Sequence, residues 1–379
     1  MPRIPFSVIL KAHQENRLLP LLLKECRTID SARNELRWLR ERALRDSQSL
    51  SRSNTGWRAR LRSMCQLRSR GYPLQYILGD QPFGNLEILC KKGVLIPRYV
   101  YHIPDRDTSP NFPRPETESY TYQAARLICQ IALDSKQKSR SGSNSRALRV
   151  IDLCTGTGCI SLLLHALLAP HFQKLSITGV DISPIAFSLA QKNLEHNMRL
   201  GQLTSRASTD IHFHRGNVLG NGSDGSTPSI DSILQPYYSE ADSSPADQTN
   251  GCDLLISNPP YISPHEFGNG TTARSVRLFE PKLALVPPSL VTGEESDRPE
   301  DIFYYHILAL SFKLRAKVTV LECGDMGQAK RIVSLHDTLA SRELGQFRAE
   351  IWPSSERDLT ENGFHATDGS RAVIIRRLS

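Results

Sequence analysis

The segment Asn258-Pro259-Pro260-Tyr261 combines residue types that suit chemistry at a planar nitrogen. Each proline has a fixed φ and no amide hydrogen, so the pair favours a rigid, extended turn with free backbone carbonyl groups. Asn258 Oδ1 and the Pro259 carbonyl oxygen could then both accept from one substrate NH2 group. Tyr261 could stack on that group and offer a π face to a cation. We expect Asn258, Pro259 and Tyr261 to be catalytic, and all four residues to bind the substrate.

A glycine-rich turn follows a short apolar run that reads as a strand, and a helical pattern begins directly after it. Gly156 and Gly158 would let a ligand approach the backbone at the carboxyl edge of a parallel sheet. The phosphate-loop pattern G-x-x-x-x-G-K-[ST] is absent, and a glycine turn by itself could be only a tight strand-to-helix connection. The residues that we expect to bind a cofactor here are Thr155, Gly156, Thr157, Gly158 and Cys159.

Asp181 ends the next apolar run, about twenty-five residues after the glycine turn. A carboxylate in that position can accept hydrogen bonds from both hydroxyl groups of a ribose, which predicts an adenosine-containing ligand. Taken singly, Asp181 could instead cap the helix that begins near Pro184. Asn217 follows a third strand and could meet the adenine edge, although a lone Asn is more often a turn former.

NAD and S-adenosylmethionine both fit the glycine turn and Asp181, and the Asn-Pro-Pro-Tyr tetrad favours the second. A clamp on both hydrogens of an amide would aim its nitrogen at a sulfonium methyl group and disfavour amide resonance, so positioning would supply most of the catalysis. Direct in-line displacement needs no covalent nucleophile, and we expect no metal. We predict an S-adenosylmethionine-dependent methyltransferase in which Asn258 contacts both donor and substrate.

The elements that would position these residues form a doubly wound α/β domain. We expect strands over 148–153, 176–181, 210–215, 253–257 and 317–322, helices over 120–133, 160–168, 184–197 and 302–314, and a closing antiparallel pair over 347–353 and 370–378. The predicted domains are a helical N-terminal domain over 1–70, a β-hairpin connector over 71–119 with an insertion near 98–113, and a methyltransferase domain over 120–379 with a disordered insertion near 220–251.

Composition narrows the class of protein. With 379 residues and 39% apolar content, the chain can bury a large core. No apolar run approaches the roughly 18 residues of a membrane helix, so we expect no membrane association. The eight cysteines lack paired C-x-x-C spacing, which indicates reduced, intracellular thiols. Residues 1–70 hold sixteen Lys and Arg against six Asp and Glu. That excess suggests an anionic partner such as RNA or a ribonucleoprotein, or else only a solvated helical face.

Two further segments resemble the HemK-type release-factor glutamine methyltransferases. They are P-R-P-E-T-E at residues 113–118 and S-V-R-L-F-E-P-K-L-A-L at residues 275–285. The tetrad alone is also similar to enzymes acting on DNA adenine or ribosomal RNA guanine, so these two segments are what favour protein glutamine. The resemblance runs from about residue 71 to the C-terminal R-A-V-I-I-R-R, and the helical N-terminal segment sits where that family has one.

The resemblance implies a class I S-adenosylmethionine-dependent methyltransferase fold, with a mostly parallel seven-stranded sheet and a small N-terminal helical domain. It implies N5-methylation of the glutamine in the Gly-Gly-Gln loop of a peptide-chain release factor, with S-adenosylmethionine as donor. By position, Thr155–Cys159, Asp181 and Asn217 would bind the donor, and Asn258–Tyr261 would hold the glutamine amide. The partner would be a release factor, and we expect a monomer without a stable nucleic-acid complex. The helical domain and its basic residues favour a mitochondrial location over a cytoplasmic one.

Three departures from the family pattern affect this interpretation. Cys154 replaces the first glycine of the usual D-x-G-x-G-x-G turn, which would be tolerated only at negative φ. Asn217 stands where an aspartate is common. Sixteen extra residues near 98–113 split the family's L-I-P-R-P-E-T-E segment, and our hypothesis is a retained intron or gene-model error, with a lineage-specific loop as the alternative. The competing functions are a nucleic-acid adenine or guanine methyltransferase and an inactive donor-binding module.

Overall fold

The computed structural model describes residues 3–49, 56–97, 117–138, 147–220, 227–237, 251–288, 298–343, 345–352 and 371–378. The chain packs as two compact units. The first, here called the helical unit, comprises residues 1–81, 89–96 and 268–281. The second, the sheet unit, comprises residues 82–88, 97–267 and 282–379. The predicted insertion near 98–113 lies outside the described residues.

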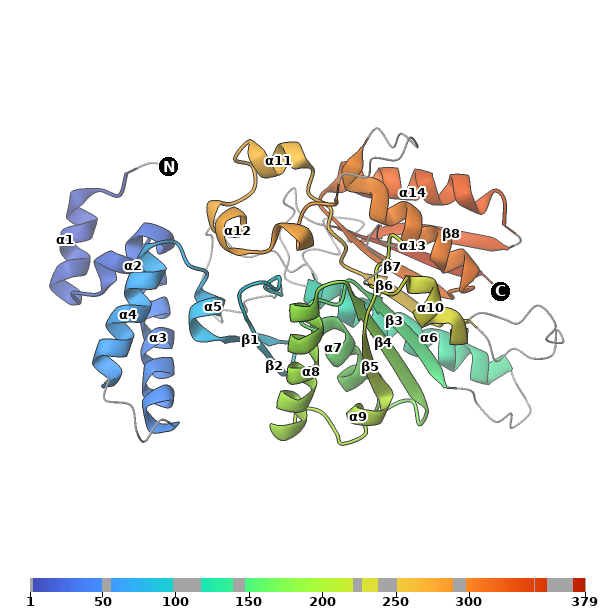
Figure 1. Cartoon of the computed structure of the whole chain (residues 1–379), viewed down its shortest axis with the longest axis horizontal. Helices are drawn as coiled ribbons and strands as arrows, with labels where there is room; N and C mark the ends of the chain where they lie inside the picture. The colour runs from blue at the N-terminus through green and yellow to red at the C-terminus, as the bar shows by residue number, and fades with distance from the viewer. Residues whose placement is uncertain are drawn as a thin grey trace. The chain divides into compact units, whose positions relative to one another are not determined.

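The helical unit contains α1 (Phe6–Glu15), α2 (Leu19–Cys26), α3 (Ile29–Ser49), α4 (Trp57–Ser69) and α5 (Leu74–Leu78), drawn in the blue part of Figure 1. Its core consists of buried aliphatic side chains spaced along one face of each helix, such as Leu22, Leu39 and Leu61. Arg68 joins α4 to α3, because its Nε and Nη2 donate to the two carboxylate oxygens of Glu35 at 2.8 and 2.9 Å. The bidentate geometry fixes the crossing of these two helices.

A segment from far along the chain also belongs to the helical unit. It includes α12 (Arg274–Phe279), and therefore most of the family-like segment at 275–285. The Phe279 ring lies 4.3 Å from that of Tyr72, centroid to centroid. Glu280 is buried, and its Oε2 accepts from the Ile96 backbone amide at 3.2 Å. These contacts explain why aromatic and acidic residues follow each other in that segment.

The sheet unit is built on seven strands in the order β5-β4-β3-β6-β7-β9-β8. The strands β3 to β7 are parallel, whereas β9 pairs antiparallel with both β7 and β8. The mostly parallel seven-stranded sheet of the prediction is therefore confirmed (Figure 1). The strand bounds are β3 (Leu148–Leu153), β4 (Leu175–Asp181), β5 (Ile211–Arg215), β6 (Leu254–Ser257), β7 (Val318–Cys323), β8 (Gln346–Trp352) and β9 (Arg371–Leu378).

Two apolar cores lie on the two faces of this sheet, since neighbouring strand residues point to opposite sides. Val150 belongs to one core and Ile151 to the other, and Leu254 and Leu255 divide in the same way. The first core is completed by α6 (Thr117–Lys138), α7 (Cys159–Leu168) and α8 (Pro184–Arg199). The second is completed by α10 (Ile230–Leu234), α13 (Ile302–Lys313) and α14 (Met326–Ala340). This is the doubly wound arrangement that the sequence predicts.

The connector predicted over residues 71–119 contains a hairpin, β1 (Asp80–Phe83) paired with β2 (Leu86–Leu89). The short helix α5 in front of it was not expected. The prediction of disorder across 220–251 is wrong for residues 227–237, which form α10 and a 3-10 turn, η1 (Gln235–Tyr237). Its polar composition hid three apolar residues, Ile230, Leu234 and Tyr237, that bury their side chains in the second core.

Among the helices of the described ranges, none combines the length and apolar character needed to cross a membrane. The described residues also contain no group of three or more His, Cys, Asp or Glu side chains arranged to hold a metal ion. The eight cysteines all lie in the described ranges, and none of them forms a disulfide bond.

Candidate active site

The predicted site residues gather at one edge of the sheet, where the parallel strands end. β3 lies between β4 and β6, so chains leave it in opposite directions at this point. Such a switch point is where open α/β sheets bind ligands. The glycine turn follows β3, Asp181 ends β4, and the tetrad begins at Asn258 after β6. Asn217 follows β5 at the same edge.

Asp181 organises the glycine turn. Its Oδ2 accepts from the Gly156 backbone amide at 2.8 Å, and its Oδ1 accepts from the Ser183 amide at 2.8 Å. Burial raises the pKa of Asp181, and these two backbone donors lower it in part. The helix cap of α8 is Ser183, whose Oγ accepts from the Ala186 amide, so Asp181 is not itself the capping residue. The Asp181 carboxylate therefore joins the end of β4 to the turn that follows β3. This is the position at which we expect the methyl donor to bind.

The two glycines of the turn have different physical roles. Both have positive φ, 57° at Gly156 and 80° at Gly158. A Cβ on Gly156 would meet nothing closer than a backbone oxygen at 4.0 Å, so the backbone is open on that side. A Cβ on Gly158 would lie 2.9 Å from Phe213 and 3.1 Å from Ala190. Gly156 keeps the turn accessible to a ligand, whereas Gly158 permits close helix-to-strand packing.

Cys154 corrects one expectation. We predicted that a cysteine would be tolerated in this turn only at negative φ, but its φ is +60°. Most L-residues avoid that left-handed region, which is why glycine is usual there. The side chain packs against the second core, and burial raises the pKa of its thiol well above the ordinary value. The thiol stays protonated at neutral pH and acts as a small packed group, without the thiolate that a nucleophile needs.

Asp152 lies beneath the glycine turn and was missed by the sequence analysis. It is fully buried, and its Oδ2 accepts from Thr155 Oγ1 at 2.6 Å and from Ser161 Oγ at 2.7 Å. Its Oδ1 has no hydrogen-bond partner among the described residues. Burial raises the pKa of Asp152 to about 6, against the lowering effect of hydrogen bonds from Ser161 and Thr155. An acid inside the apolar run V-I-D-L is the signal that could have identified it.

The tetrad leaves β6 with its two prolines buried and Asn258 partly exposed. No hydrogen bond joins the Asn258 side chain to another residue in the described part of the chain, so both its oxygen and its amide group are available to a ligand. Ser257 Oγ donates to the Leu153 carbonyl at 2.8 Å, which fixes the end of β6 against the end of β3. The tetrad is thus held rigidly next to the glycine turn.

Tyr261 is tied to Glu322, a second residue that the sequence analysis missed. Glu322 belongs to β7 and is fully buried. Its Oε1 lies 3.1 Å from the Tyr261 hydroxyl, and its Oε2 accepts from Thr117 Oγ1 at 2.9 Å. Burial, followed by the negative charge of Glu322, raises the pKa of the nearby Tyr120 well above its ordinary value. The signal in the sequence is again an acid in an apolar strand, V-T-V-L-E-C.

Asn217 acts as a turn former, which is one of the two roles that the sequence left open for it. Its Oδ1 accepts from the Leu219 amide at 3.0 Å, and its backbone pairs with Pro228 and Ile230. The amide nitrogen of its side chain is therefore the group left to meet a ligand at this edge.

Comparison with known proteins gives relatives over most of the chain. The protein named "Probable MRF1 mitochondrial N(5)-glutamine methyltransferase mtq1" of Schizosaccharomyces pombe is 31% identical over 338 residues, which cover 88% of this chain and 90% of that protein. The mitochondrial MRF1 N(5)-glutamine methyltransferase MTQ1 of Saccharomyces cerevisiae is 33% identical over 76% of this chain and 68% of that protein. A release factor glutamine methyltransferase of Haemophilus influenzae is 31% identical over 60% of this chain and 58% of that protein.

No protein-family model matches the chain. Among solved structures, the N-terminal domain of human METTL16 in complex with SAH is 17% identical, with a TM-score of 0.39 over 81% of each chain.

Proposed function

Because this chain belongs to the release factor glutamine methyltransferase family, we propose that its sheet edge methylates the glutamine in the Gly-Gly-Gln loop of a release factor. The enzyme uses S-adenosylmethionine and acts on N5 of the glutamine side chain. The observation that supports the assignment of this edge is the rigid tetrad at the end of β6, whose Asn258 side chain forms no hydrogen bond with any other residue that the structure describes.

The residues around the glycine turn fit the donor. The open side of Gly156 admits a ligand to the backbone, and the Asp181 carboxylate stands where ribose hydroxyl groups can donate to it. The unpartnered Oδ1 of Asp152 is a buried acceptor that a positively charged donor would stabilise. When bound, S-adenosylmethionine supplies an electrophilic methyl group on a sulfonium. Thr155, Thr157, Cys159 and Asn217 complete the proposed donor site.

The tetrad would hold the substrate amide. Asn258 Oδ1 and the Pro259 carbonyl oxygen would each accept one amide hydrogen, which orients the nitrogen and reduces its conjugation with the carbonyl group. Pro259 and Pro260 supply rigidity, because their rings fix φ and both are buried. Tyr261 would stack on the planar amide. After methyl transfer the amide nitrogen releases one proton, which water can accept.

Glu322 is a positioning residue in this proposal. Its carboxylate holds the Tyr261 hydroxyl on one oxygen and the Thr117 hydroxyl on the other. Thr117 belongs to the family-like P-R-P-E-T-E segment, so this buried acid connects that segment to the tetrad. The Tyr261 ring is further limited by Gly324, since a Cβ at that glycine would lie 3.3 Å from Tyr261 Cδ2. We infer that the ring direction is set before the substrate arrives.

We also propose a mitochondrial location and a mitochondrial release factor as substrate. Two relatives are named as mitochondrial MRF1 methyltransferases, and residues 1–70 hold sixteen basic against six acidic side chains. Side-by-side methylation of mitochondrial and cytosolic release factors, together with subcellular fractionation, tests this point. Preference for the cytosolic factor and recovery of the protein in the cytosol would contradict it.

The central experiment measures transfer of labelled methyl from S-adenosylmethionine to a purified release factor. We expect labelling of the wild-type factor and none when the glutamine of its Gly-Gly-Gln loop is replaced by alanine. Asn258→Ala should reduce turnover about 100-fold, because a positioned hydrogen-bonding group is lost at the reacting atom. Asn34→Ala is the matched control, since Asn34 is equally half-buried but lies on α3. Labelling that survives the Gln-to-Ala change, or labelling of nucleic acid instead, refutes the proposal.

A further inference from the structure

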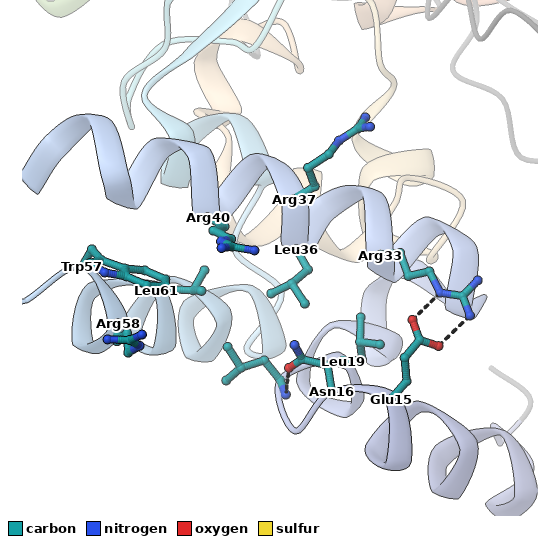
Figure 2. A pocket seen from close by; sticks show the side chains of 11 residues that line it. Glu15, Asn16, Leu19, Arg33, Leu36, Arg37, Arg40, Trp57, Arg58 and Leu61 are labelled. Atoms are coloured by element: carbon teal, nitrogen blue, oxygen red, sulfur yellow. Dashed lines mark hydrogen bonds and ion pairs between the residues drawn. The ribbon is translucent and has the colours of Figure 1, made fainter.

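The helical unit contains a pocket of about 620 Å³ between α3, α4 and the connection from α1 to α2. Figure 2 shows its layout, with Leu36, Leu61 and Leu19 between the helices, Arg40 and Arg58 near Trp57, and Arg37 extending from α3 away from the leucine side chains. The floor includes Leu19, Leu36 and Leu61, of which Leu19 and Leu61 are buried. Its volume lies within the range of about 300–1,000 Å³ that is usual for small-ligand sites. No residue of the pocket takes part in the proposed methyl transfer.

The rim of the pocket has an excess of positive charge. Arg33 is neutralised, because Nε and Nη2 donate to both oxygens of Glu15 at 2.5 and 2.6 Å and Nη1 donates to Asp30. Arg37, Arg40 and Arg58 also line the pocket, and all three are exposed. None of these three forms an ion pair with a carboxylate in the described part of the chain. Two exposed guanidinium groups, those of Arg40 and Arg58, therefore lie at the apolar floor, and Arg37 adds positive charge on the other side of α3.

Trp57 holds two of these guanidinium groups in place. The Cζ atom of Arg58 lies 4.7 Å from the centroid of the indole ring, and that of Arg40 lies 5.6 Å from it. Stacking of this kind restricts side chains that otherwise have large rotamer freedom. Less entropy is then lost when an anion is bound, so the pair is prepared for an anionic ligand.

The number of uncompensated charges indicates the kind of anion. A carboxylate offers one negative charge and two oxygens, whereas a run of phosphate groups offers one charge at each successive position along a strand. Arginine forks suit phosphate oxygens, and the apolar floor can receive an unstacked base or ribose between them. A duplex keeps its bases stacked inside and could present only its backbone to such a hollow.

We propose that this pocket binds single-stranded RNA, with phosphate groups on Arg40 and Arg58 and a nucleoside on the leucine floor. Binding is dominated by charge, so it is salt-sensitive and transient and does not form a stable complex. This site is independent of methyl transfer. It gives the basic N-terminal segment a function at a defined position.

The test is fluorescence anisotropy of the full-length protein with a labelled twelve-nucleotide single-stranded RNA over a range of salt concentrations. The pocket variant is Arg40→Gln with Arg58→Gln. The matched control is Arg45→Gln with Arg62→Gln, which removes the same charge from exposed positions on the same two helices, outside the pocket. We expect the pocket variant to weaken binding at least 10-fold and to reduce the salt slope by about 1.4, or about 0.7 per lost phosphate contact. The control should stay within about 2-fold of wild type.

Three results would overturn the proposal. An equal loss of RNA affinity in both variants would assign the binding to the overall positive charge of the helical unit. Absence of RNA binding at low salt would show that the pocket is not an RNA site. An oligoglutamate peptide of equal charge that binds as tightly as the RNA would assign the pocket to an acidic protein segment. Circular dichroism and methyl transfer to the release factor, which we expect to be unchanged, verify that both variants are folded.

Discussion

The hydroxyl group of Tyr261 lies 3.1 Å from Oε1 of Glu322, a fully buried carboxylate whose other oxygen accepts from Thr117 at 2.9 Å. Three segments that are distant in the sequence meet at this one acid: the start of α6, the end of β6 and the end of β7. A buried carboxylate is stabilised only when both oxygens have donors. The contact therefore links the rigidity of the tetrad to the presence of Thr117.

Removal of either partner of the Tyr261–Glu322 contact should reduce turnover. We expect Tyr261→Phe and Glu322→Gln each to lower kcat about 10-fold, because the ring keeps its place but loses its fixed direction, while the affinity for S-adenosylmethionine stays within about 2-fold. If the two groups act as a unit, the double variant is no worse than either single one. Multiplicative losses in a double-mutant cycle measured by steady-state kinetics would show that the two residues act separately.

Thr117→Val tests the other side of the same carboxylate. The change keeps the shape of the side chain and leaves Glu322 Oε2 without its donor, so we expect a loss of stability of about 1–3 kcal/mol and a lower kcat. Thr121→Val is the matched control in the same helix, since the Thr121 hydroxyl is also buried but donates only to the Thr117 carbonyl. Thermal unfolding and turnover of the two variants decide the matter. Equal effects on turnover would contradict a special role for Thr117.

Cys154 allows a test of backbone strain in the glycine turn. Its φ of +60° costs an L-residue about 1 kcal/mol, which glycine avoids. Cys154→Ala and Cys154→Gly both lose the thiol packing, but only the second relieves the strain. We therefore expect the glycine variant to be about 1 kcal/mol more stable than the alanine variant in urea unfolding, and both to remain active. Loss of turnover in both variants would contradict the assignment of the thiol as a packing group.

The strands of the sheet unit could be predicted because their residues are almost uniformly apolar. β6 and β7 are buried along their whole length, and a short apolar run between turn residues is what a buried parallel strand requires. The segment Leu74–Leu78 is just as apolar and short but forms the helix α5, since periodicity cannot separate strand from helix over five residues.

The positions of the site residues could be predicted from strand ends, whereas their partners could not. Asn258 and Asp181 follow apolar runs directly, so the edge of the sheet was sufficient to bring them together. The partners of Glu322 come from the starts and ends of other elements, and only the folded chain determines them. The arginine pocket has the same origin, because α3 and α4 contribute side chains that are spaced regularly only within each helix. The positive φ of Cys154 could not be predicted from the residue type, because a cysteine rarely adopts it.

Asp152 gives a prediction about pH. Its pKa is raised to about 6 in the folded chain, above an ordinary value of 3.8, because burial disfavours the charged form. The folded state thus binds this proton more tightly than the unfolded state does. Its contribution to stability is fully present below about pH 3.8 and is lost as pH rises through about 6. Above that pH the buried negative charge of Asp152 destabilises the protein that has no S-adenosylmethionine bound.

Bound S-adenosylmethionine would compensate the negative charge of Asp152, since its sulfonium group is positive. Asp152→Asn keeps an acceptor for Thr155 and Ser161 but carries no charge, so the donor-free variant should be about 1–3 kcal/mol more stable at pH 8. Its affinity for S-adenosylmethionine should be about 10-fold lower than that of the wild type at pH 7.5. The wild-type affinity should itself fall between pH 7 and pH 5, whereas that of the variant should change little.

Calorimetric titration with the donor at pH 5.5 and 7.5, together with urea unfolding, measures both effects. Asp134→Asn removes an equal charge from an exposed position on α6 and serves as the control. An affinity that is independent of pH in the wild type would contradict the role of Asp152 at the donor. A variant that is less stable than the wild type at pH 8 would mean that the two hydroxyl donors compensate the buried charge without any help from the ligand.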